Sequence, residues 1–389
     1  MFIDEVKANL NDCIRPFWTD LMDKEYGGFY GRKDYDLNLY KEAEKGVILN
    51  SRILWFFSTS YLTLPKDEDL VCADHAFDYL VKHCLDKEYG GVFWSTNYDG
   101  TPLDTTKHTY NQAFAIYALS AYYDASKKQQ ALDIALQLFE MIEEKCTDEF
   151  GYLEAFDREF KPVENDKLSE NGIIAEKTMN TLLHVFEAYT ELYRVSKDAR
   201  VREKLIWMLD IFAEKVYNPK LRRQDVFFDR EMNNLIDLQS YGHDIETTWL
   251  IDRGVEVLGD PEIEARITPI TSNLRAWVYE LAYRDSSLVN ECENGVVDTT
   301  RIWWVQAESV VGFLNGYQKE GKQEYLDAAK AIWEYIRDNI VDKRPGSEWF
   351  YEVDENRQPA KKDIVEPWKC PYHNGRMCLE VIRRKVDVA

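Results

Sequence analysis

The feature that most constrains the fold is a glycine–aromatic stretch that recurs along the chain. It occurs at residues 26–30 (Tyr-Gly-Gly-Phe-Tyr), 89–94 (Tyr-Gly-Gly-Val-Phe-Trp) and 150–153 (Phe-Gly-Tyr-Leu), with a degenerate relative at 349–352 (Trp-Phe-Tyr-Glu). The first three copies begin at a spacing of about 60 residues. Such a period predicts stacked supersecondary units. Each copy is itself typical of a turn that leads into a short strand.

Between these stretches, apolar residues recur with helical periodicity. We expect twelve helices, near residues 2–22, 44–64, 67–86, 107–125, 127–146, 174–195, 197–216, 242–258, 261–284, 301–319, 322–341 and 371–385. The odd-numbered helices of this series are amphipathic with charged faces, whereas the even-numbered ones are richer in apolar residues. A helix with a charged face can meet water, and a mostly apolar helix is buried.

This alternation predicts an all-α fold, an (α/α)6 barrel in which six outer helices surround six inner ones. Six repeats of about 65 residues would account for the chain of 389 residues. The long loops, where we expect short β-hairpins, precede the even-numbered helices, so they must gather at one end of the barrel and can build a site there. No linker divides the sequence, and we expect residues 1–389 to form a single catalytic domain.

Charge and cysteine content exclude several classes of partner. The formal net charge of −22 argues against binding to nucleic acid and to anionic membrane surfaces. Seven cysteines without CxxC spacing argue against a disulfide framework and favour a reducing compartment. The N-terminus lacks the apolar stretch of a secretory signal, and no apolar run approaches the ~18 residues that span a bilayer. We expect a cytoplasmic monomer.

Polar and aromatic residues open the predicted inner helices. His243 and Glu246 are three residues apart, so a helix starting near Tyr241 puts both on one face, where a carboxylate could hold a histidine as a general base. Four of the six histidines lie at such helix starts: His108, His184, His243 and His373. If the barrel closes, these four converge on one pocket, which makes it a candidate site.

The same residues also have structural interpretations. A single histidine is more often a buried polar or surface residue than a catalyst. Arg52, within an apolar helix, could pair with a buried carboxylate, and Trp303, Trp304 and Tyr110 could be core residues. Several histidines in one pocket could bind zinc, but the HExxH pattern is absent, as are the glycine-rich nucleotide motifs. We expect neither a metal nor a cofactor.

Five stretches carry a resemblance to a known family: residues 50–56 (Asn-Ser-Arg-Ile-Leu-Trp-Phe), 177–180 (Lys-Thr-Met-Asn), 240–246 (Ser-Tyr-Gly-His-Asp-Ile-Glu), 302–308 (Ile-Trp-Trp-Val-Gln-Ala-Glu) and 368–377 (Trp-Lys-Cys-Pro-Tyr-His-Asn-Gly-Arg-Met). They resemble cellobiose 2-epimerases, of the N-acetylglucosamine 2-epimerase superfamily of (α/α)6 barrels. The resemblance covers nearly the whole chain, and the last stretch is long and specific. It implies reversible epimerisation at C2 of the reducing-end sugar of β-1,4-linked disaccharides, with cellobiose giving glucosyl-mannose and lactose giving epilactose.

The resemblance also implies roles for individual residues. His243 and His373 would be the acid/base pair, Glu246 would orient His243, and His184 would assist ring opening. Arg52 would hold the oxygens on C1 and C2. The residues expected around the sugars are Tyr110, Asn180, Trp303, Trp304, Glu308 and Trp368.

The chemistry of C2 inversion requires side chains of these types. The C2 proton is acidic only beside a carbonyl, so the ring must first open, a step that a histidine can assist. Proton removal gives an enediolate, whose negative charge calls for a fixed cation such as Arg52. Return of a proton to the other face needs either a second acid/base or rotation of the intermediate, and a pair of histidines on facing helices supplies the first option. No metal or nicotinamide is required.

Three alternatives remain open. The first is a monosaccharide 2-epimerase or an aldose–ketose isomerase of the same superfamily. The second is a glycoside hydrolase on the same barrel, with Glu246 and Glu308 as its two carboxylates. The third is a sugar-binding protein without catalysis, which would not need four convergent histidines. The expected partner is a disaccharide such as cellobiose, lactose or β-1,4-mannobiose.

Overall fold

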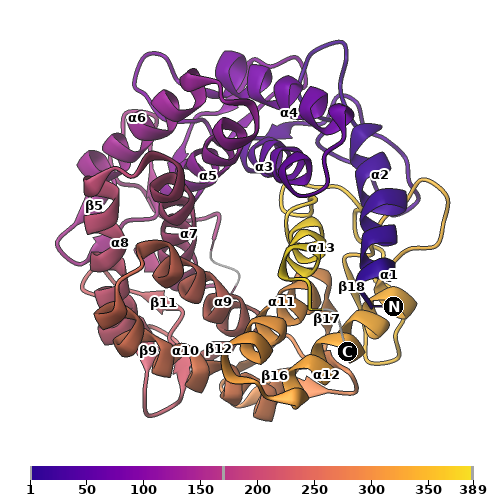
Figure 1. Cartoon of the computed structure of the whole chain (residues 1–389). Coiled ribbons are helices and arrows are strands. Elements are labelled where there is room, and N and C mark those ends of the chain that lie inside the picture. Colours follow the sequence, from indigo (N-terminus) through magenta and orange to yellow (C-terminus); the bar gives the residue numbers. More distant parts are fainter. Residues whose placement is uncertain (1, 169–170, 387–389) are drawn as a thin grey trace.

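The computed structural model describes residues 2–168 and 171–386, and its helices form two concentric rings (Figure 1). The inner ring consists of α3 (Val47–Thr63), α5 (Thr109–Ser126), α7 (Met179–Ser196), α9 (Tyr241–Leu258), α11 (Trp303–Glu320) and α13 (His373–Arg384). Each inner helix contacts the next in chain order, and α13 contacts α3, so the ring is closed. The predicted all-α barrel is confirmed for the described part of the chain.

The outer ring is built from helices that each pack against an inner helix. Its members are α1 (Phe2–Asn9) with η1 (Leu10–Ile14) and α2 (Arg15–Thr19), α4 (Asp67–Tyr79) with η2 (Leu80–Cys84), α6 (Gln129–Lys145), α8 (Ala199–Ile211) with η3 (Phe212–Val216), α10 (Pro261–Ala282), and α12 (Gln323–Tyr335) with η4 (Ile336–Ile340). The η segments are π-helical turns. The chain therefore alternates outer and inner helices from its N-terminus to α13, as the sequence pattern predicted.

Burial explains the difference in composition between the two rings. All residues of α3 from Val47 to Ser60 are buried, because this helix is surrounded by neighbours. In α6 the buried residues repeat at helical spacing along one face, from Ala131 to Ile142, and the other face meets water. No helix in the described ranges is both long enough and apolar enough to cross a bilayer.

Short antiparallel strands link the long loops to one another. Five inner helices are entered through a lead-in strand: β1 (Lys45–Gly46), β4 (Lys107–His108), β8 (Lys177–Thr178), β12 (Leu238–Ser240) and β17 (Arg301–Ile302). Each pairs with a strand of the next long loop, respectively β2 (Ser95–Thr96), β7 (Ala155–Phe156), β11 (Phe227–Phe228), β15 (Glu291–Glu293) and β18 (Glu352–Val353). A bridge between Lys33 and Val365 joins the first long loop to the last. These strand pairs and the bridge link successive long loops at one end of the barrel.

The remaining strands complete hairpins within single loops, as the sequence predicted. They are β3 (Pro102–Asp104), β5 (Thr147–Asp148), β6 (Gly151–Tyr152), β9 (Tyr217–Asn218), β10 (Arg223–Gln224), β13 (Tyr283–Arg284), β14 (Ser287–Leu288) and β16 (Val296–Asp298). Four predicted helix starts, at residues 44, 107, 174 and 301, were too early. The helices begin at Val47, Thr109, Met179 and Trp303, each directly after a lead-in strand. Periodicity does not distinguish a two-residue buried strand from the first turn of a buried helix.

The recurring glycine–aromatic stretch forms a turn that is tied to the next inner helix. Asp23 accepts hydrogen bonds from the backbone N–H groups of Glu25 and Tyr26, and Gly27 and Gly28 follow with φ of 84° and 65°. Glycine adopts such positive φ without strain. The buried Nζ of Lys45, in β1, donates to Asp23 Oδ2 at 2.6 Å and to the carbonyl of Gly27 at 2.8 Å. Similar lysine–aspartate pairs recur as Lys107 with Asp86 and Lys177 with Asp148.

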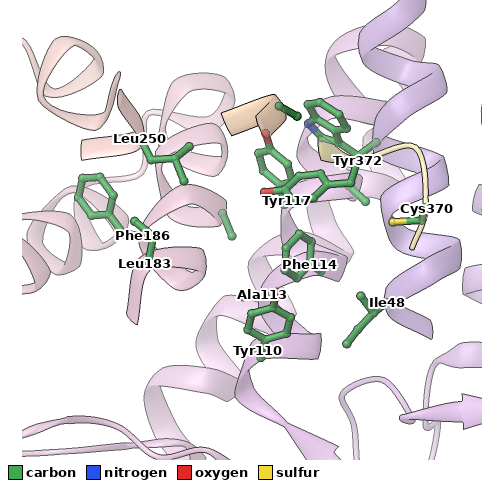
Figure 2. Packing of buried hydrophobic residues seen from close by; sticks show 14 of the residues in the cluster. Ile48, Tyr110, Ala113, Phe114, Tyr117, Leu183, Phe186, Leu250, Cys370 and Tyr372 are labelled. Carbon is green, nitrogen blue, oxygen red and sulfur yellow. The ribbon is translucent and has the colours of Figure 1, made fainter. Parts of the chain in front are cut away.

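Aromatic packing fills the barrel beneath these loops. Tyr110, Phe114 and Tyr117 lie three and four residues apart on α5 and face the interior, where Phe114 and Tyr117 approach Tyr372 (Figure 2). The ring centroids of Phe114 and Tyr372 are 5.1 Å apart in an edge-to-face arrangement. This packing fixes the end of the last loop, from which α13 and His373 follow.

Candidate active site

One cavity at the long-loop end of the barrel brings together nearly all the predicted site residues. The predicted residues that line it are Arg52, Tyr110, Asn180, His184, His243, Glu246, Trp303, Trp304, Trp368 and His373. They come from all six inner helices and the loop before α13, so segments that are far apart in the sequence meet in this cavity. Convergence of the inner-helix starts on one pocket, which the sequence suggested, is what the structure shows.

His243 lies in the first turn of α9 beside Trp304. Its Nδ1 is 2.8 Å from Ser240 Oγ, and its ring centroid is 4.7 Å from that of Trp304. The expectation that Glu246 orients His243 is therefore not met. Glu246 lies one turn further into the barrel, where its Oε1 accepts a hydrogen bond from the guanidinium of Arg376. The three-residue spacing puts both side chains on one helix face. His243 nevertheless pairs with the hydroxyl of Ser240, and Glu246 pairs with the guanidinium of Arg376.

His373 opens α13 and also lies beside Trp304, with ring centroids 5.5 Å apart. Its Nδ1 is 2.8 Å from Glu308 Oε1. Glu308 was expected to contact the sugars, but it is fully buried behind His373 and does not line the cavity. The indole N–H of Trp249 also donates to it, at 3.0 Å. Glu308 thus holds a histidine in place, the task that the sequence had assigned to Glu246.

His184, on α7, is held in the same way by a residue that the sequence analysis did not single out. Its Nδ1 is 2.8 Å from Oε2 of Glu187, which also accepts a hydrogen bond from the hydroxyl of Tyr372. His184 and Glu187 have the three-residue spacing that had drawn attention to His243 and Glu246. The signal was therefore present in the sequence at this position as well.

Of the four histidines that were expected to converge, His108 does not line the cavity. It is the last residue of β4, and its ring packs against Trp94 with centroids 4.8 Å apart. The expectation that four histidines converge is corrected to three. The reason is that His108 precedes the first turn of α5 and lies in a strand paired with β7, so its side chain is held among the loops.

Burial keeps the two histidines beside Trp304 neutral. It lowers the pKa of His243 to about 3, and nearby His184 acts in the same direction. Burial also lowers the pKa of His373 well below its ordinary value, with further contributions from Arg376 and Arg52. Both imidazoles therefore present a nitrogen that can accept a proton at neutral pH.

Arg52 is a buried cation that faces the cavity. Its guanidinium donates to the hydroxyl of Tyr110 at 2.8 Å and to the carbonyl of Trp368 at 3.3 Å, and it lies 4.2 Å from the ring centroid of Phe114. In residues 2–168 and 171–386, no carboxylate forms an ion pair with it. The structural alternative for Arg52, pairing with a buried carboxylate, is therefore not the arrangement found, and its charge is available to a bound anion.

A cluster of carboxylates surrounds Arg376 next to the cavity, and Glu246 is its member that lines the cavity. Among the described residues, Glu246, Glu308 and His373 offer ligand atoms within 4.8 Å of one another, a grouping that could in principle hold a metal ion. The guanidinium of Arg376 contacts both carboxylates of this group, with Nη2 2.6 Å from Glu308. A fixed positive charge therefore already stands beside these oxygens. Burial and Glu308 raise the pKa of Glu246 to about 7, although Arg376 acts against this.

Comparison with known proteins gives a consistent result. Residues 28–375 match the family model described as N-acylglucosamine 2-epimerase (GlcNAc 2-epimerase). A cellobiose 2-epimerase of Ruminococcus albus is 50% identical over 389 residues, which cover all of both chains. One of Eubacterium cellulosolvens is 51% identical over 399 residues, covering 98% of each chain. The solved structure of cellobiose 2-epimerase from Bacillus thermoamylovorans B4167 superimposes with a TM-score of 0.96 at 44% identity, over 98% of this chain and 99% of that one.

Proposed function

Because the chain belongs to the N-acylglucosamine 2-epimerase family and is a carbohydrate epimerase, we propose that it is a cellobiose 2-epimerase in which residues 1–389 form one catalytic domain. Its reaction would be reversible inversion of C2 in the reducing-end glucose of β-1,4-linked disaccharides. Relatives named for this activity are about half identical over their whole length, which supports the choice of substrate class. Cellobiose would give glucosyl-mannose, and lactose would give epilactose.

The observation that carries the proposal is the placement of two neutral histidines, His243 and His373, beside Trp304 in one cavity. In the proposed reaction, His184 assists opening of the sugar ring to the aldehyde, which makes the C2 proton acidic. One of His243 and His373 then removes that proton from one face, and the other returns a proton to the opposite face. One proton leaves C2 and one proton returns to it, so the reaction is redox-neutral. Exchange of protons with solvent then resets the two histidines for the next turnover.

Arg52 is suited to stabilise the intermediate between these two steps. Loss of the C2 proton leaves an enediolate with negative charge on the oxygens of C1 and C2. An unpaired guanidinium in a buried site stabilises such a charge more strongly than it would in water. The hydrogen bond from Arg52 to Tyr110 keeps the guanidinium in place while no substrate is bound.

The cavity is lined by residues of the long loops as well as by the inner helices, and this supports a disaccharide rather than a single sugar. Lys167, Asn171, Glu291 and Tyr351, all from loops, contribute to its lining. Polar groups and an aromatic ring at the mouth are the chemistry that a second hexose would contact. We propose that this part of the cavity holds the non-reducing sugar.

The glycoside hydrolase alternative is less favoured by the placement of the two glutamates. A hydrolase needs two carboxylates on opposite sides of the glycosidic bond, separated by ~5–9.5 Å. Glu246 and Glu308 instead hold the same nitrogen, Nη2 of Arg376, and Glu308 does not line the cavity. Three histidines would also have no role in hydrolysis.

Incubation of the purified protein with cellobiose, lactose and free mannose, followed by product identification, tests the proposal directly. We expect the C2 epimer from both disaccharides and little reaction of mannose. Fructose from mannose would identify an aldose–ketose isomerase, and free glucose from cellobiose would identify a hydrolase. Either result would overturn the proposed function.

The pH profile is expected to reflect the low pKa values of the histidines. The neutral imidazole is the form that accepts a proton, so a pKa of about 3 for His243 keeps the active form populated well below pH 6.5. We expect kcat/KM for cellobiose to stay nearly constant from about pH 8 down to about pH 5. An acidic limb centred near pH 6.5 would contradict the assignment of these buried histidines as proton acceptors.

Trp368 is expected to contribute to binding through its ring. It lies in the cavity wall, with its centroid 5.8 Å from Trp94 and 5.9 Å from Tyr110. We expect Trp368→Ala to raise KM for cellobiose roughly fivefold to tenfold, which corresponds to ~1–1.5 kcal/mol of lost ring contact. Initial-rate kinetics on cellobiose measure this. Unchanged KM and kcat would remove Trp368 from the binding site.

A further inference from the structure

Arg376 is a buried arginine at the centre of the carboxylate cluster, and it has no role in the proposed mechanism so far. It lies on α13, three residues after His373, and only 1% of its surface is exposed. Its guanidinium contacts three carboxylates that come from three different inner helices: Glu187 of α7, Glu246 of α9 and Glu308 of α11. All three are buried as well.

Two of these carboxylates are the ones that hold histidines of the site. Glu187 binds Arg376 through Oε1 and His184 through Oε2, and Glu308 binds both Arg376 and His373 through Oε1. A carboxylate on Nδ1 fixes the tautomer and the ring orientation, so that Nε2 is directed away from it. The orientation of both imidazoles therefore depends on carboxylates that share one cation.

We propose that Arg376 is a positioning residue that orients His184 and His373 together, through Glu187 and Glu308. One buried guanidinium would then align the group that opens the sugar ring with a group that transfers the C2 proton. This inference rests on the proposed function, because it assigns the two histidines to successive steps of epimerisation.

The geometry of the guanidinium explains why an arginine is needed. Its planar fork donates from Nη1 toward Glu187 and from Nη2 toward Glu246 and Glu308. Tyr372, which also contacts Nη1, is hydrogen-bonded to Glu187 and closes the arrangement on that side. A lysine ammonium carries the same charge at a single point and does not span carboxylates from three helices.

Arg376 also lies outside the substrate cavity. It lines a second cavity toward the opposite end of the barrel, together with Glu187, Trp55, Tyr117 and Trp249. The ion cluster is thus a partition between the two cavities, and a bound sugar would not touch the guanidinium. A change at Arg376 is therefore expected to alter turnover and to leave substrate binding nearly unchanged.

The test is Arg376→Lys with cellobiose as substrate. We expect kcat to fall about 10–100-fold, as is usual when a residue that orients a catalytic group is replaced, with KM within about threefold of wild type. The matched control is Arg275→Lys. Arg275 is likewise buried and bridges two acidic groups, Asp252 and Glu320, but it lies on the outer helix α10. We expect this control to lower the unfolding temperature without changing kcat.

A double-mutant cycle with Glu308→Gln separates positioning from a structural role. If Arg376 acts through Glu308, the double variant loses little more kcat than the more impaired single variant, because both changes remove the same orientation. Multiplicative losses would contradict the inference, and so would a folded Arg376→Lys with kcat within about threefold of wild type. A large change in KM alone would contradict it too.

Two isosteric variants keep the inference testable if Arg376→Lys does not fold. Glu187→Gln should slow ring opening, measured by anomer exchange, and Glu308→Gln should slow deuterium exchange at C2. Because ring opening precedes transfer of the C2 proton, Glu308→Gln should leave anomer exchange within about threefold of wild type. A variant that slows neither step would overturn the inference. If the wild type itself does not exchange the C2 proton of cellobiose, the proposed function fails. If the wild type exchanges it and the variants do so equally, only the role of Arg376 fails.

Discussion

Replacing His243 or His373 by asparagine is expected to lower kcat for cellobiose epimerisation by at least ~100-fold, because each supplies one of two proton transfers and such help is worth ~10²–10⁴-fold. The two variants should not be equivalent. If each histidine serves one face of C2, each variant loses the exchange of one epimer and retains that of the other. Proton exchange at C2 of cellobiose and of glucosyl-mannose, followed by NMR in heavy water, measures both.

His108→Asn is the matched control for these variants. His108 is a buried histidine next to the start of an inner helix, like the other two, but it packs on Trp94 outside the cavity. We expect its kcat to remain within about threefold of the wild-type value. Near wild-type epimerisation by the His243 or the His373 variant would exclude that residue from the mechanism.

Arg52→Met is expected to lower kcat about 10²–10³-fold, the loss that follows removal of one preorganised donor to a developing oxyanion. The variant should nevertheless fold. Arg52 forms no ion pair with a carboxylate in the described part of the chain, so its removal leaves no buried anion behind. Methionine keeps most of the side-chain volume against Phe114 and Tyr372. Turnover and thermal unfolding, measured on the same preparation, give the two quantities.

Arg15→Met is the control for Arg52→Met, because it is expected to lower stability and to leave turnover unchanged. Arg15 is buried on α2 and pairs with Asp69 at 3.1 Å, far from the cavity in the outer ring. Removing it leaves a buried carboxylate without its partner, a change that typically costs ~3–5 kcal/mol. We expect lower stability with unchanged kcat. An Arg52→Met variant that keeps wild-type turnover, or that loses stability as Arg15→Met does, would show that Arg52 has only a structural role.

The helices could be predicted because their signal is local. An outer helix shows apolar residues at helical spacing on one face, and an inner helix is apolar along most of its length. Both patterns can be recognised within a short stretch of sequence. Four of the five lead-in strands fell within predicted helices, because two residues are too few to show a period. Their pairing across loops, as between Lys107 and Phe156, is a long-range contact that no local pattern specifies.

In the site, too, the positions of the histidines could be predicted from the sequence, whereas their hydrogen-bond partners could not. Convergence of His184, His243 and His373 follows from barrel closure, because each lies near the start of an inner helix. Which carboxylate holds which histidine does not follow from spacing. Both His184–Glu187 and His243–Glu246 are three residues apart, yet only the first pair is hydrogen-bonded. The cation of Arg376, brought in from α13, draws Glu246 and Glu308 together and leaves Ser240 as the partner of His243.

The most direct test of a two-histidine C2 epimerase is the early reaction of cellobiose in heavy water, with deuterium located in both product and remaining substrate. The account predicts one deuterium at C2 of glucosyl-mannose, delivered by the histidine on the far face. It also predicts that unreacted cellobiose gains deuterium more slowly than glucosyl-mannose, because the histidine that removed the proton can return it before exchanging with solvent. Equal labelling of both sugars would contradict two separate acid/base groups, and epimerisation without deuterium at C2 would contradict proton transfer at that carbon.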